Sequence, residues 1–374
     1  MPFPQLDAQQ IRTSPLADRR SYLDIRAIAL DPAAAPPEAG PLTRPIEQVA
    51  QRVQQARQRG AAVILAYGAH LIKNGGGPLL RALIQGGWVT HLATQGAGII
   101  HDWEFAWLGR SSESVRDNTP QGRFGSWEET GRWLNLAALA GAAQGLGLGE
   151  ALGRLVAQEG LTLPEPAALA QAIRAEPQAS TTAAQADLLH TMQRFHLRPG
   201  RQEVPHPFKQ FSVLAASYTQ HVPLTVHPGI GYDIITNHPL FHGAALGRGA
   251  GIDARIFARS VMDLSGGVYL SIGSAIMSPQ IFEKALSLAN NVLLQTGQGV
   301  HDHDIVVVDL QEGGGWDWSQ GEPPKDHPAY YLRFCKTFHR MGGRLTYLCA
   351  DNRLVLAHLL AHLSGQSPRK SATE

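Results

Sequence analysis

The segment from Leu65 to Glu104 constrains the fold more than any other part of the chain. It contains an apolar run, a glycine-rich turn, a helix-like stretch, a second apolar run and a second glycine turn. Two strands joined by one helix form a right-handed crossover, so their carboxyl ends emerge at the same edge of a parallel sheet. Ligands of open α/β sheets bind at that edge. The edge carries small residues followed by His101 and Asp102, which predicts a ligand site for a molecule with phosphates, and an enzyme.

The same order of strand, glycine turn and helix recurs further along the chain. It is seen in VPLTVHPGIGYDII, in GGVYLSIGSAIMSPQ, in DIVVVDLQEGGGWDW and in GGRLTYLCAD. Apolar strands without alternation are typical of parallel sheets that are covered on both faces. The sequence therefore predicts an α/β fold: a Rossmann-like, doubly wound, mostly parallel sheet with helices on both faces.

The distribution of Pro, Ala, Gly and polar residues suggests the domain organisation. Residues 1–43 are rich in Pro and Ala and are expected to form an extended arm. Residues 44–365 are expected to form a single α/β domain, with a helical insertion at about 128–203. Residues 366–374 are expected to be a disordered tail.

Composition and charge limit the class of protein. The 374 residues have a formal net charge of +1, which gives no field suited to nucleic acid or to a membrane surface. No segment is long and apolar enough to predict a membrane span, and the N-terminus lacks a signal-peptide pattern. The two cysteines exclude a disulfide framework and a cysteine-rich zinc site. A cytoplasmic setting is the expectation.

Several titratable residues follow the predicted strands. His101, Asp102 and Glu104 follow the second glycine turn, and His227 and Asp233 follow a later strand. The first three could form an acid/base pair, supply metal ligands, or begin a helix with favourable acids near its dipole. No standard metal-binding spacing is present, so no metal is expected.

A glycine-rich loop with two tryptophans, GGGWDW, forms the second candidate region. It follows a predicted strand and contains Trp316 and Asp317. An acid beside indoles suits a cationic amine, because cations bind both carboxylates and aromatic faces. A buried interface contact would explain the same residues equally well.

These blocks resemble deoxyhypusine synthase. LAYGAHLIKNG and THLATQGAGIIHD align with that family's NAD loops, and the resemblance continues through VPLTVHPGIGYDII, GGVYLSIGSAI, DLQEGGGWDW and CAD. It covers roughly 46–363, with weak matching between 110 and 204. The resemblance implies a single NAD-binding domain and a homo-oligomer, a dimer or tetramer with shared active sites. It also implies oxidation of a polyamine by NAD, followed by aminoalkyl transfer through a lysine.

Carried over position by position, the resemblance implies two sets of site residues. Substrate binding is expected at Asp102, Glu104, Asp233, Trp316 and Asp317. The residues expected to contact NAD lie on four loops: Gly68, Ala69, His70, Asn74, Thr94, Gln95, Gly96, Ala97, Gly98, Gly273, Ser274, Ala350 and Asp351.

Three positions depart from the family pattern. His101 replaces a family glutamate near the nicotinamide, and the family histidine falls at Ser278 or Pro279. The family lysine aligns with Arg333 by direct counting, or with Lys336 after a three-residue insertion. We prefer Lys336, because a guanidinium stays protonated and cannot form an imine.

The sequence thus predicts an NAD-dependent enzyme that acts on a small-molecule amine. His101 or His227 would accept a proton, and Lys336 would form the covalent imine if the reaction is a transfer. Two alternatives stay open: a non-catalytic, regulatory NAD-binding protein, and a metal-dependent hydrolase. The positions of His101, Asp102 and Asp233 should discriminate between an enzyme and a non-catalytic protein. If these residues form helix caps and salt bridges, the non-catalytic protein is favoured.

Overall fold

The computed structural model describes residues 3–364 of the chain. Its centre is a parallel sheet of six strands in the order β10-β9-β8-β2-β3-β7. This is the strand order of doubly wound dinucleotide-binding folds, so the predicted fold class is confirmed. The strands are β2 (Val63–Tyr67), β3 (His91–Thr94), β7 (Leu224–Val226), β8 (Val268–Ile272), β9 (Asp304–Asp309) and β10 (Arg344–Cys349).

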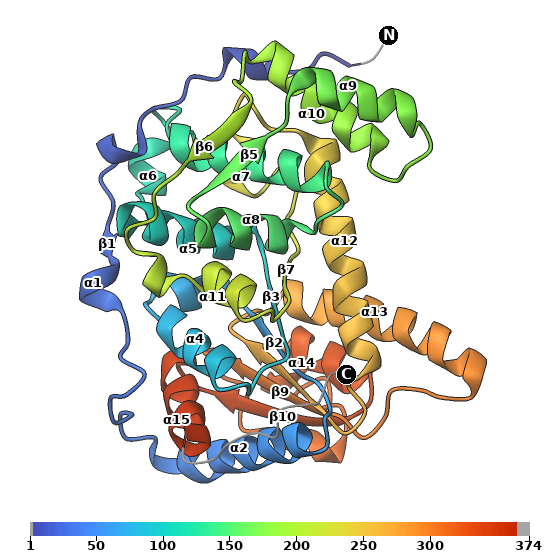
Figure 1. Ribbon diagram of the computed structural model, residues 1–374. Helices are drawn as coiled ribbons and strands as arrows, with labels where there is room; N and C mark the ends of the chain where they lie inside the picture. The colour runs from blue at the N-terminus through green and yellow to red at the C-terminus, as the bar shows by residue number, and fades with distance from the viewer. Residues whose placement is uncertain (1–2, 365–374) are drawn as a thin grey trace.

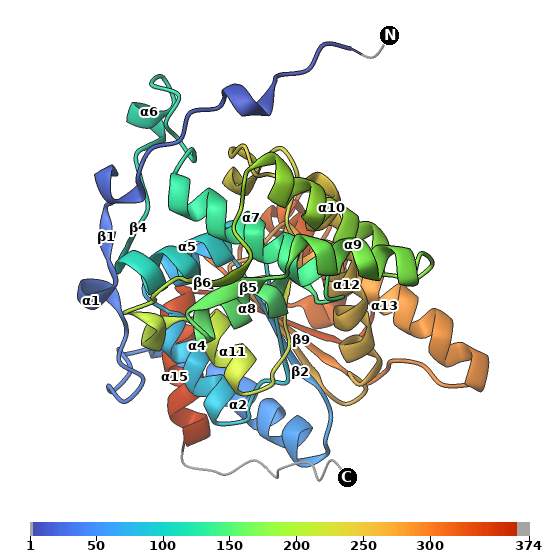
Figure 2. The same cartoon turned by 45° about the horizontal axis from the view of Figure 1, so that its top comes forward.

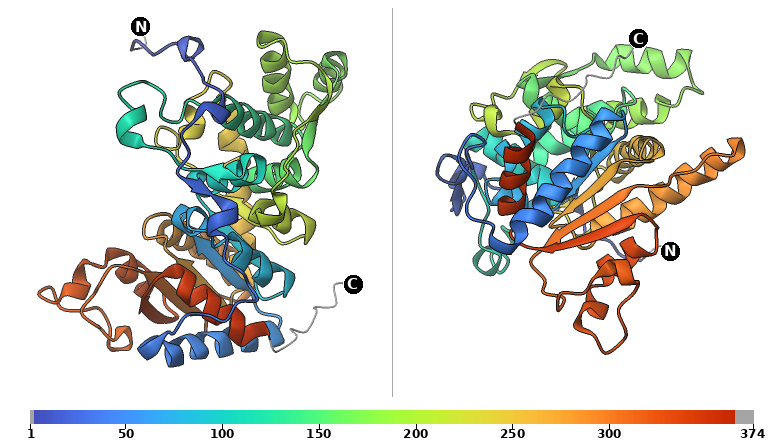
Figure 3. Two further views of the ribbon diagram at one scale, coloured as in Figure 1. Left: turned by 90° about the vertical axis from the view of Figure 1, so that its left-hand side faces the viewer. Right: turned by 90° about the horizontal axis from the view of Figure 1, so that it is seen from below.

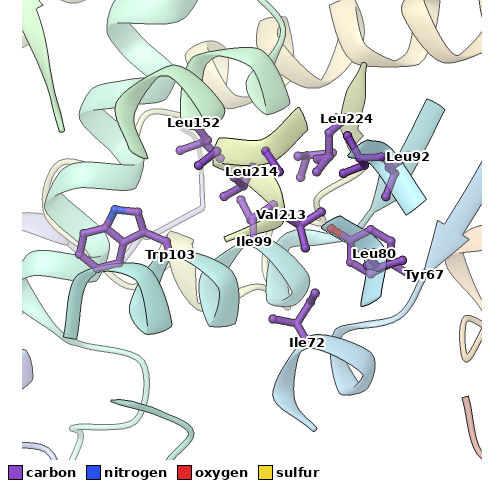
Figure 4. Close-up of a cluster of buried hydrophobic side chains, with 14 of the residues drawn as sticks. Tyr67, Ile72, Leu80, Leu92, Ile99, Trp103, Leu152, Val213, Leu214 and Leu224 are labelled. Carbon is purple, nitrogen blue, oxygen red and sulfur yellow. The ribbon is translucent and has the colours of Figure 1, made fainter. Parts of the chain in front are cut away.

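Successive residues of the central strands face opposite sides of the sheet. In β2, Val63 and Leu65 belong to one hydrophobic cluster, whereas Ile64 and Ala66 belong to the other. Both faces of the strand are therefore buried, which explains why the sequence VILAY is apolar throughout. The first cluster includes Tyr67, Leu92, Ile99, Trp103 and Leu214 (Figure 4).

Helices cover both faces of the sheet, as expected for a doubly wound fold (Figure 1). The first face packs against α2 (Thr43–Gln58), α4 (Gly77–Gln85), α5 (Gly96–Leu108), α11 (Val213–Thr219) and α15 (Asn352–Ser364). The second face packs against α12 (Gly243–Met262), α13 (Met277–Leu293) and α14 (Arg333–His339).

The segment predicted as a helical insertion lies beyond one end of the sheet (Figure 3). Its helices are α7 (Glu128–Ala142), α8 (Leu148–Ala157), α9 (Pro166–Ala175) and α10 (Thr182–Arg194). It also contains an antiparallel strand pair that was not predicted, β5 (Gly160–Leu163) and β6 (Gly200–Glu203). Each strand is only four residues long, and its partner is far away in the sequence. The sequence pattern of each strand is therefore weaker than the helical patterns around it.

The N-terminal arm runs along one side of the domain (Figure 2). It includes α1 (Ile25–Ile28) and a short strand, β1 (Leu23–Asp24), which pairs antiparallel with β4 (Arg110–Ser111). Leu16 and Arg19 are buried against the domain. The arm is therefore packed on its own chain and is not merely an extended segment.

The sheet has a topological switch point between β2 and β8. The chain proceeds from β2 to β3 and β7 on one side, and then returns through α12 to β8 on the other. The backbones that leave β2 and β8 touch, because a Cβ atom on Gly68 would lie 2.0 Å from the carbonyl oxygen of Gly273. A crevice at such a point is where open α/β sheets bind ligands.

None of the helices in residues 3–364 is long and apolar enough to cross a membrane. The predicted tail, residues 366–374, lies outside the described residues.

Two helical glycines provide a test of the packing between α8 and the sheet. A Cβ on Gly149 would lie 1.7 Å from the Leu224 carbonyl oxygen, whereas one on Gly247, exposed on α12, would meet nothing within 4 Å. We expect Gly149→Ala to lower the free energy of unfolding by about 1–3 kcal/mol. The matched change Gly247→Ala should raise it by about 0.5–1 kcal/mol, because alanine favours the helix. Urea unfolding of both variants measures the difference, and equal effects would contradict the packing described here.

Candidate functional site

Two adjoining pockets lie at the carboxyl edge of the sheet. The first, here the switch-point pocket, has a volume of about 360 Å³ and is lined in part by Gly68, His70 and Gly273. The second, here the arm-side pocket, has a volume of about 260 Å³ and includes Arg19 and Asp233 in its wall. Both pockets are lined by Lys73, Ala97 and His101.

The two pockets bring together part of the predicted site. His101 lines both pockets, and Glu104 and Asp233 line the arm-side pocket. The residues of the predicted cofactor loops that line the switch-point pocket are Gly68, Ala69, His70, Gln95, Ala97, Gly273 and Ser274.

His101 lies in the second turn of α5, between the two pockets. Its Nδ1 atom is 2.8 Å from the hydroxyl oxygen of Ser111, on β4. Burial lowers the pKa of His101 to about 4, with further lowering by the positive charge of Lys73 nearby. The ring is therefore neutral at ordinary pH and can act as a proton acceptor.

Glu104 is not free to bind a substrate. It is 1% exposed and forms a bidentate ion pair with Arg19 of the arm, at 2.8 and 2.7 Å. Burial alone would raise the pKa of Glu104, but the charge and hydrogen bonds of Arg19 outweigh it and lower the pKa. The predicted substrate contact is replaced by a structural ion pair that anchors the arm.

Asp102 caps a helix and faces away from both pockets. Its carboxylate accepts hydrogen bonds from the hydroxyl of Ser212 and from the backbone N–H of Val213, at 2.5 and 2.7 Å, at the start of α11. Burial raises the pKa of Asp102 to about 6 despite these bonds. Asp102 therefore holds α11 against α5, and its predicted role in substrate binding is not supported by this position.

Asp233 lies at the N-terminus of α5. Its carboxylate accepts from the backbone N–H of Gly229 at 2.7 Å. Burial raises the pKa of Asp233, and the nearby N–H groups of Gly96 and Ala97 oppose that rise. Gly96 must lack a side chain, since a Cβ there would lie 2.2 Å from Asp233 Oδ2. The helix start that was expected to hold a cofactor phosphate thus already faces a carboxylate of the chain itself.

A cationic side chain, Lys73, lines the switch-point pocket instead. Lys73 and His70 line this pocket together with His101, and the charge of Lys73 adds to burial in lowering the pKa of His101. In the described part of the chain, Lys73 has no carboxylate within 4.0 Å. A cation without an internal partner beside two glycine turns suits an anionic ligand such as a phosphate.

His227 belongs to a different network under α12. Its Nε2 atom is 3.1 Å from the hydroxyl of Thr225, which is 2.9 Å from Nε2 of His91. Both rings pack edge-on against Phe257. Burial lowers the pKa of His91 to about 3 and that of His227 to about 4. His227 lines neither pocket, so its predicted role as a base is not supported by its position.

The tryptophan loop and the candidate lysine form a separate region. Asp317 is exposed and caps the short helix Trp318–Gln320, and Trp316 donates its indole N–H to the carbonyl of Gly321. The Nζ atom of Lys336, on α14, lies 3.4 Å from the ring centroid of Tyr330. None of Trp316, Asp317, Lys336 and the alternative Arg333 lines the two pockets.

The remaining predicted cofactor residues serve the fold. Thr94 donates its hydroxyl proton to the Tyr67 carbonyl, and Gly98 packs against Thr94. Asp351 caps α15 and pairs with Arg353. Asn74 and Ala350 line neither pocket.

No group of three or more His, Cys, Asp or Glu residues within 3–364 is arranged to hold a metal ion. The described residues therefore lend no support to the metal-dependent hydrolase.

Sequence reasoning missed two residues that complete the surroundings of His101. Arg19 is 85 residues from its partner Glu104, and Ser111 becomes a neighbour of His101 only after the chain turns at Gly109. Neither position carries a local signal. Of the two cations that follow the first glycine turn, Lys73 lines both pockets, whereas Arg81 donates to the backbone carbonyls of Lys209 and Ser212.

No protein-family model matches the sequence, and no curated protein shows significant similarity to it. Among solved structures, similarity is found to ArgZ, an arginine dihydrolase of cyanobacteria (13% identity, TM-score 0.42, 86% of this chain and 33% of that one). It is also found to AgrE solved with ornithine and NAD+ (16% identity, TM-score 0.42, 89% of this chain and 34% of that one). A candidate deoxyhypusine synthase from Entamoeba histolytica is similar over 88% of this chain and 90% of that one (9% identity, TM-score 0.40). The chain spans about a third of the length of ArgZ and AgrE. With TM-scores below 0.5, these likenesses carry no weight for function.

The buried, neutral state of His101 predicts how stability depends on pH. A histidine with a lowered pKa binds protons more weakly in the folded chain than in the unfolded one, so its stabilising effect is present above pH 6.5 and is lost as the pH falls towards 4. We expect the free energy of unfolding to fall over this range. In His101→Gln the free energy of unfolding should fall less steeply with decreasing pH, and the slope should differ from that of the wild type by on the order of 1 kcal/mol per pH unit. Urea unfolding at a series of pH values gives both slopes, and equal slopes would contradict the burial of a neutral His101.

Proposed function

We propose that this chain is an NAD-dependent enzyme that oxidises an amine to an imine, with His101 as the general base. The observation that carries the proposal is the position of His101: a neutral imidazole lies between two pockets at the topological switch point of the sheet. A proton acceptor placed where open α/β sheets bind their ligands favours catalysis.

The residues of the switch-point pocket fit a phosphate-containing cofactor. The backbone of Gly68 and Gly273 lines this pocket, Lys73 supplies a cationic donor, and His70 offers an imidazole that can also donate a hydrogen bond. The N-terminus of α5 would contribute little, because the carboxylate of Asp233 lies against Gly96 at its start. NAD, when bound, supplies a hydride acceptor.

The arm-side pocket suits a cationic substrate. Its wall includes the carboxylates of Asp233 and Glu113 and the rings of Phe124 and Tyr232. Carboxylates and aromatic faces both attract an ammonium group. An amine bound there would have its nitrogen near His101, which could remove the ammonium proton so that the nitrogen lone pair assists loss of hydride from the adjacent carbon.

The proposal extends to oxidation and not to transfer. Aminoalkyl transfer through Lys336 stays a prediction, since Lys336 lines neither pocket. Assembly into a dimer or tetramer and a cytoplasmic location also stay predictions.

A second candidate function is a non-catalytic NAD-binding protein. It is favoured by one observation: the carboxylates of Asp102, Glu104 and Asp233 all have partners within the chain, a helix start, an ion pair and the Gly229 backbone respectively. The two functions differ in whether any amine is turned over.

Binding of NAD tests the cofactor part of the proposal. Calorimetric titration should show binding to the wild type, and Lys73→Met should weaken it about tenfold, because one charge-assisted phosphate contact is lost. Lys284→Met is the matched control, since Lys284 is exposed on α13 and pairs only with Glu283. No heat of binding at millimolar NAD would overturn the cofactor assignment.

Turnover tests the catalytic part. With NAD present, a panel of diamines and polyamines should yield NADH for at least one amine. His101→Gln should lower kcat/KM by about 10²–10⁴-fold, since a positioned base contributes about that much. The acid limb of kcat/KM should lie near pH 4, because burial lowers the pKa of His101 to about 4. Binding of NAD without oxidation of any amine would favour the non-catalytic protein.

A further inference from the structure

A chain of hydrogen bonds leads from the N-terminal arm to His101. Arg19 donates two hydrogen bonds to Glu104, and Ser111 donates its hydroxyl proton to Oε2 of Glu104 at 2.5 Å. The same hydroxyl oxygen lies 2.8 Å from Nδ1 of His101. Arg19, Glu104 and Ser111 are all buried, with at most 4% of each residue exposed.

Glu104 fixes which groups donate and which accept in this series of hydrogen bonds. Its two oxygens face only donors: the guanidinium of Arg19, the hydroxyl of Ser111, and the hydroxyl of Thr130 at 3.0 Å. A carboxylate surrounded by donors is an acceptor only, and the lowered pKa of Glu104, with Arg19 outweighing burial, agrees with its being ionised.

Ser111 transmits this direction to the imidazole. A serine hydroxyl carries a single proton, and that of Ser111 is given to Glu104. The contact with His101 can then be a hydrogen bond only if Nδ1 carries a proton and donates it to Ser111. A neutral ring protonated at Nδ1 has its lone pair on Nε2.

We propose that Arg19, Glu104 and Ser111 are positioning residues that hold His101 in the Nδ1–H tautomer, so that Nε2 is the proton acceptor of the site. The use of that acceptor in amine oxidation rests on the proposed function, but the tautomer itself does not. A residue of the arm thereby becomes part of the machinery around the two pockets.

Among the described residues, the contact with Ser111 is the only hydrogen bond that can decide which ring nitrogen of His101 carries the proton. The charged and titratable groups that act most on its pKa are Glu104 on its own helix, Arg19 of the arm, and His70 and Lys73 on α3 (Ala69–Lys73). Asp233, Glu113 and Tyr232 share the arm-side pocket with the ring, and none of them has a hydrogen bond to it among the described residues. Of these, only Glu104 reaches the ring through a hydrogen-bonded intermediary. Lys73 and His70 favour the neutral ring without selecting a nitrogen.

The change Glu104→Gln provides the sharpest test, because it reverses the chain with almost no change in shape. With its oxygen in the place of Oε1, Gln would accept from Thr130 and from Nη1 of Arg19, while its NH2 group in the place of Oε2 would donate to Ser111 and Nη2 of Arg19 would lose its acceptor. Ser111 would then donate its proton to Nδ1 of His101, which moves the ring proton to Nε2. We therefore expect the ring ¹⁵N shifts of His101 to show a pyrrole-type Nδ1 in the wild type and a pyrrole-type Nε2 in the variant, with the resonances assigned by their absence in His101→Gln.

Two further variants control the experiment. In Ser111→Ala the link is cut, so His101 should populate both tautomers. In Thr130→Val, Glu104 loses a different buried hydroxyl that does not touch His101, and the wild-type tautomer should persist. An Nε2–H tautomer in the wild type, or unchanged shifts in both Glu104→Gln and Ser111→Ala, would overturn the proposal.

The spectroscopic readout separates this inference from the proposed function. If no amine is oxidised but the shifts change as expected, the tautomer control stands and the enzyme assignment fails. If an amine is oxidised, Glu104→Gln should lower kcat about tenfold or more with little change in KM, and kcat should be unchanged in Thr130→Val. If Glu104→Gln does not fold, the wild-type and Ser111→Ala spectra decide the question.

Discussion

The buried ion pair between Arg19 and Glu104 is the interaction on which the candidate site depends most. Each partner is expensive to bury alone, and removing one partner of such a pair typically costs about 3–5 kcal/mol. The pair ties the arm to α5, and the same carboxylate accepts from Ser111 and Thr130. One carboxylate thus connects the arm, β4, α5 and α7. The position of the His101 ring follows from this arrangement, since Ser111 is the only hydrogen-bond partner of its side chain among the described residues.

Three buried carboxylates lie at the starts of helices. Asp102 and Asp253 accept from backbone N–H groups at the starts of α11 and α8, and the carboxylate of Asp233 lies against Gly96 at the start of α5. A carboxylate in this position offsets the positive end of the helix dipole. The consequence for function is that the helix dipole at α5 is already compensated by Asp233. Attraction of an anion to the switch-point pocket must therefore come mainly from side chains, above all Lys73.

The fold could be predicted well from the sequence, and the site only in part. Apolar runs such as VILAY end in glycine turns, and this local pattern specifies parallel strands buried on both faces. His101 could be found because it follows such a turn. The roles of Asp102 and Glu104 could not, because they depend on Ser212 and Arg19, which are distant in the sequence. A pattern of acids near a glycine turn is the same whether the carboxylates bind a ligand or cap a helix. Lys336 shows the reverse case: its chemistry suits an imine, but the fold places it over Tyr330.

The charges around His101 couple its basicity to occupancy of the switch-point pocket. In the structure described here, Lys73 and His70 add to burial in lowering the pKa of His101. An anion bound beside Lys73 offsets that positive charge and removes its share of the lowering, whereas burial, the largest cause, remains. The basicity of His101 therefore depends in part on whether the switch-point pocket holds an anion, and the charge of Lys73 provides that link without any movement of the backbone.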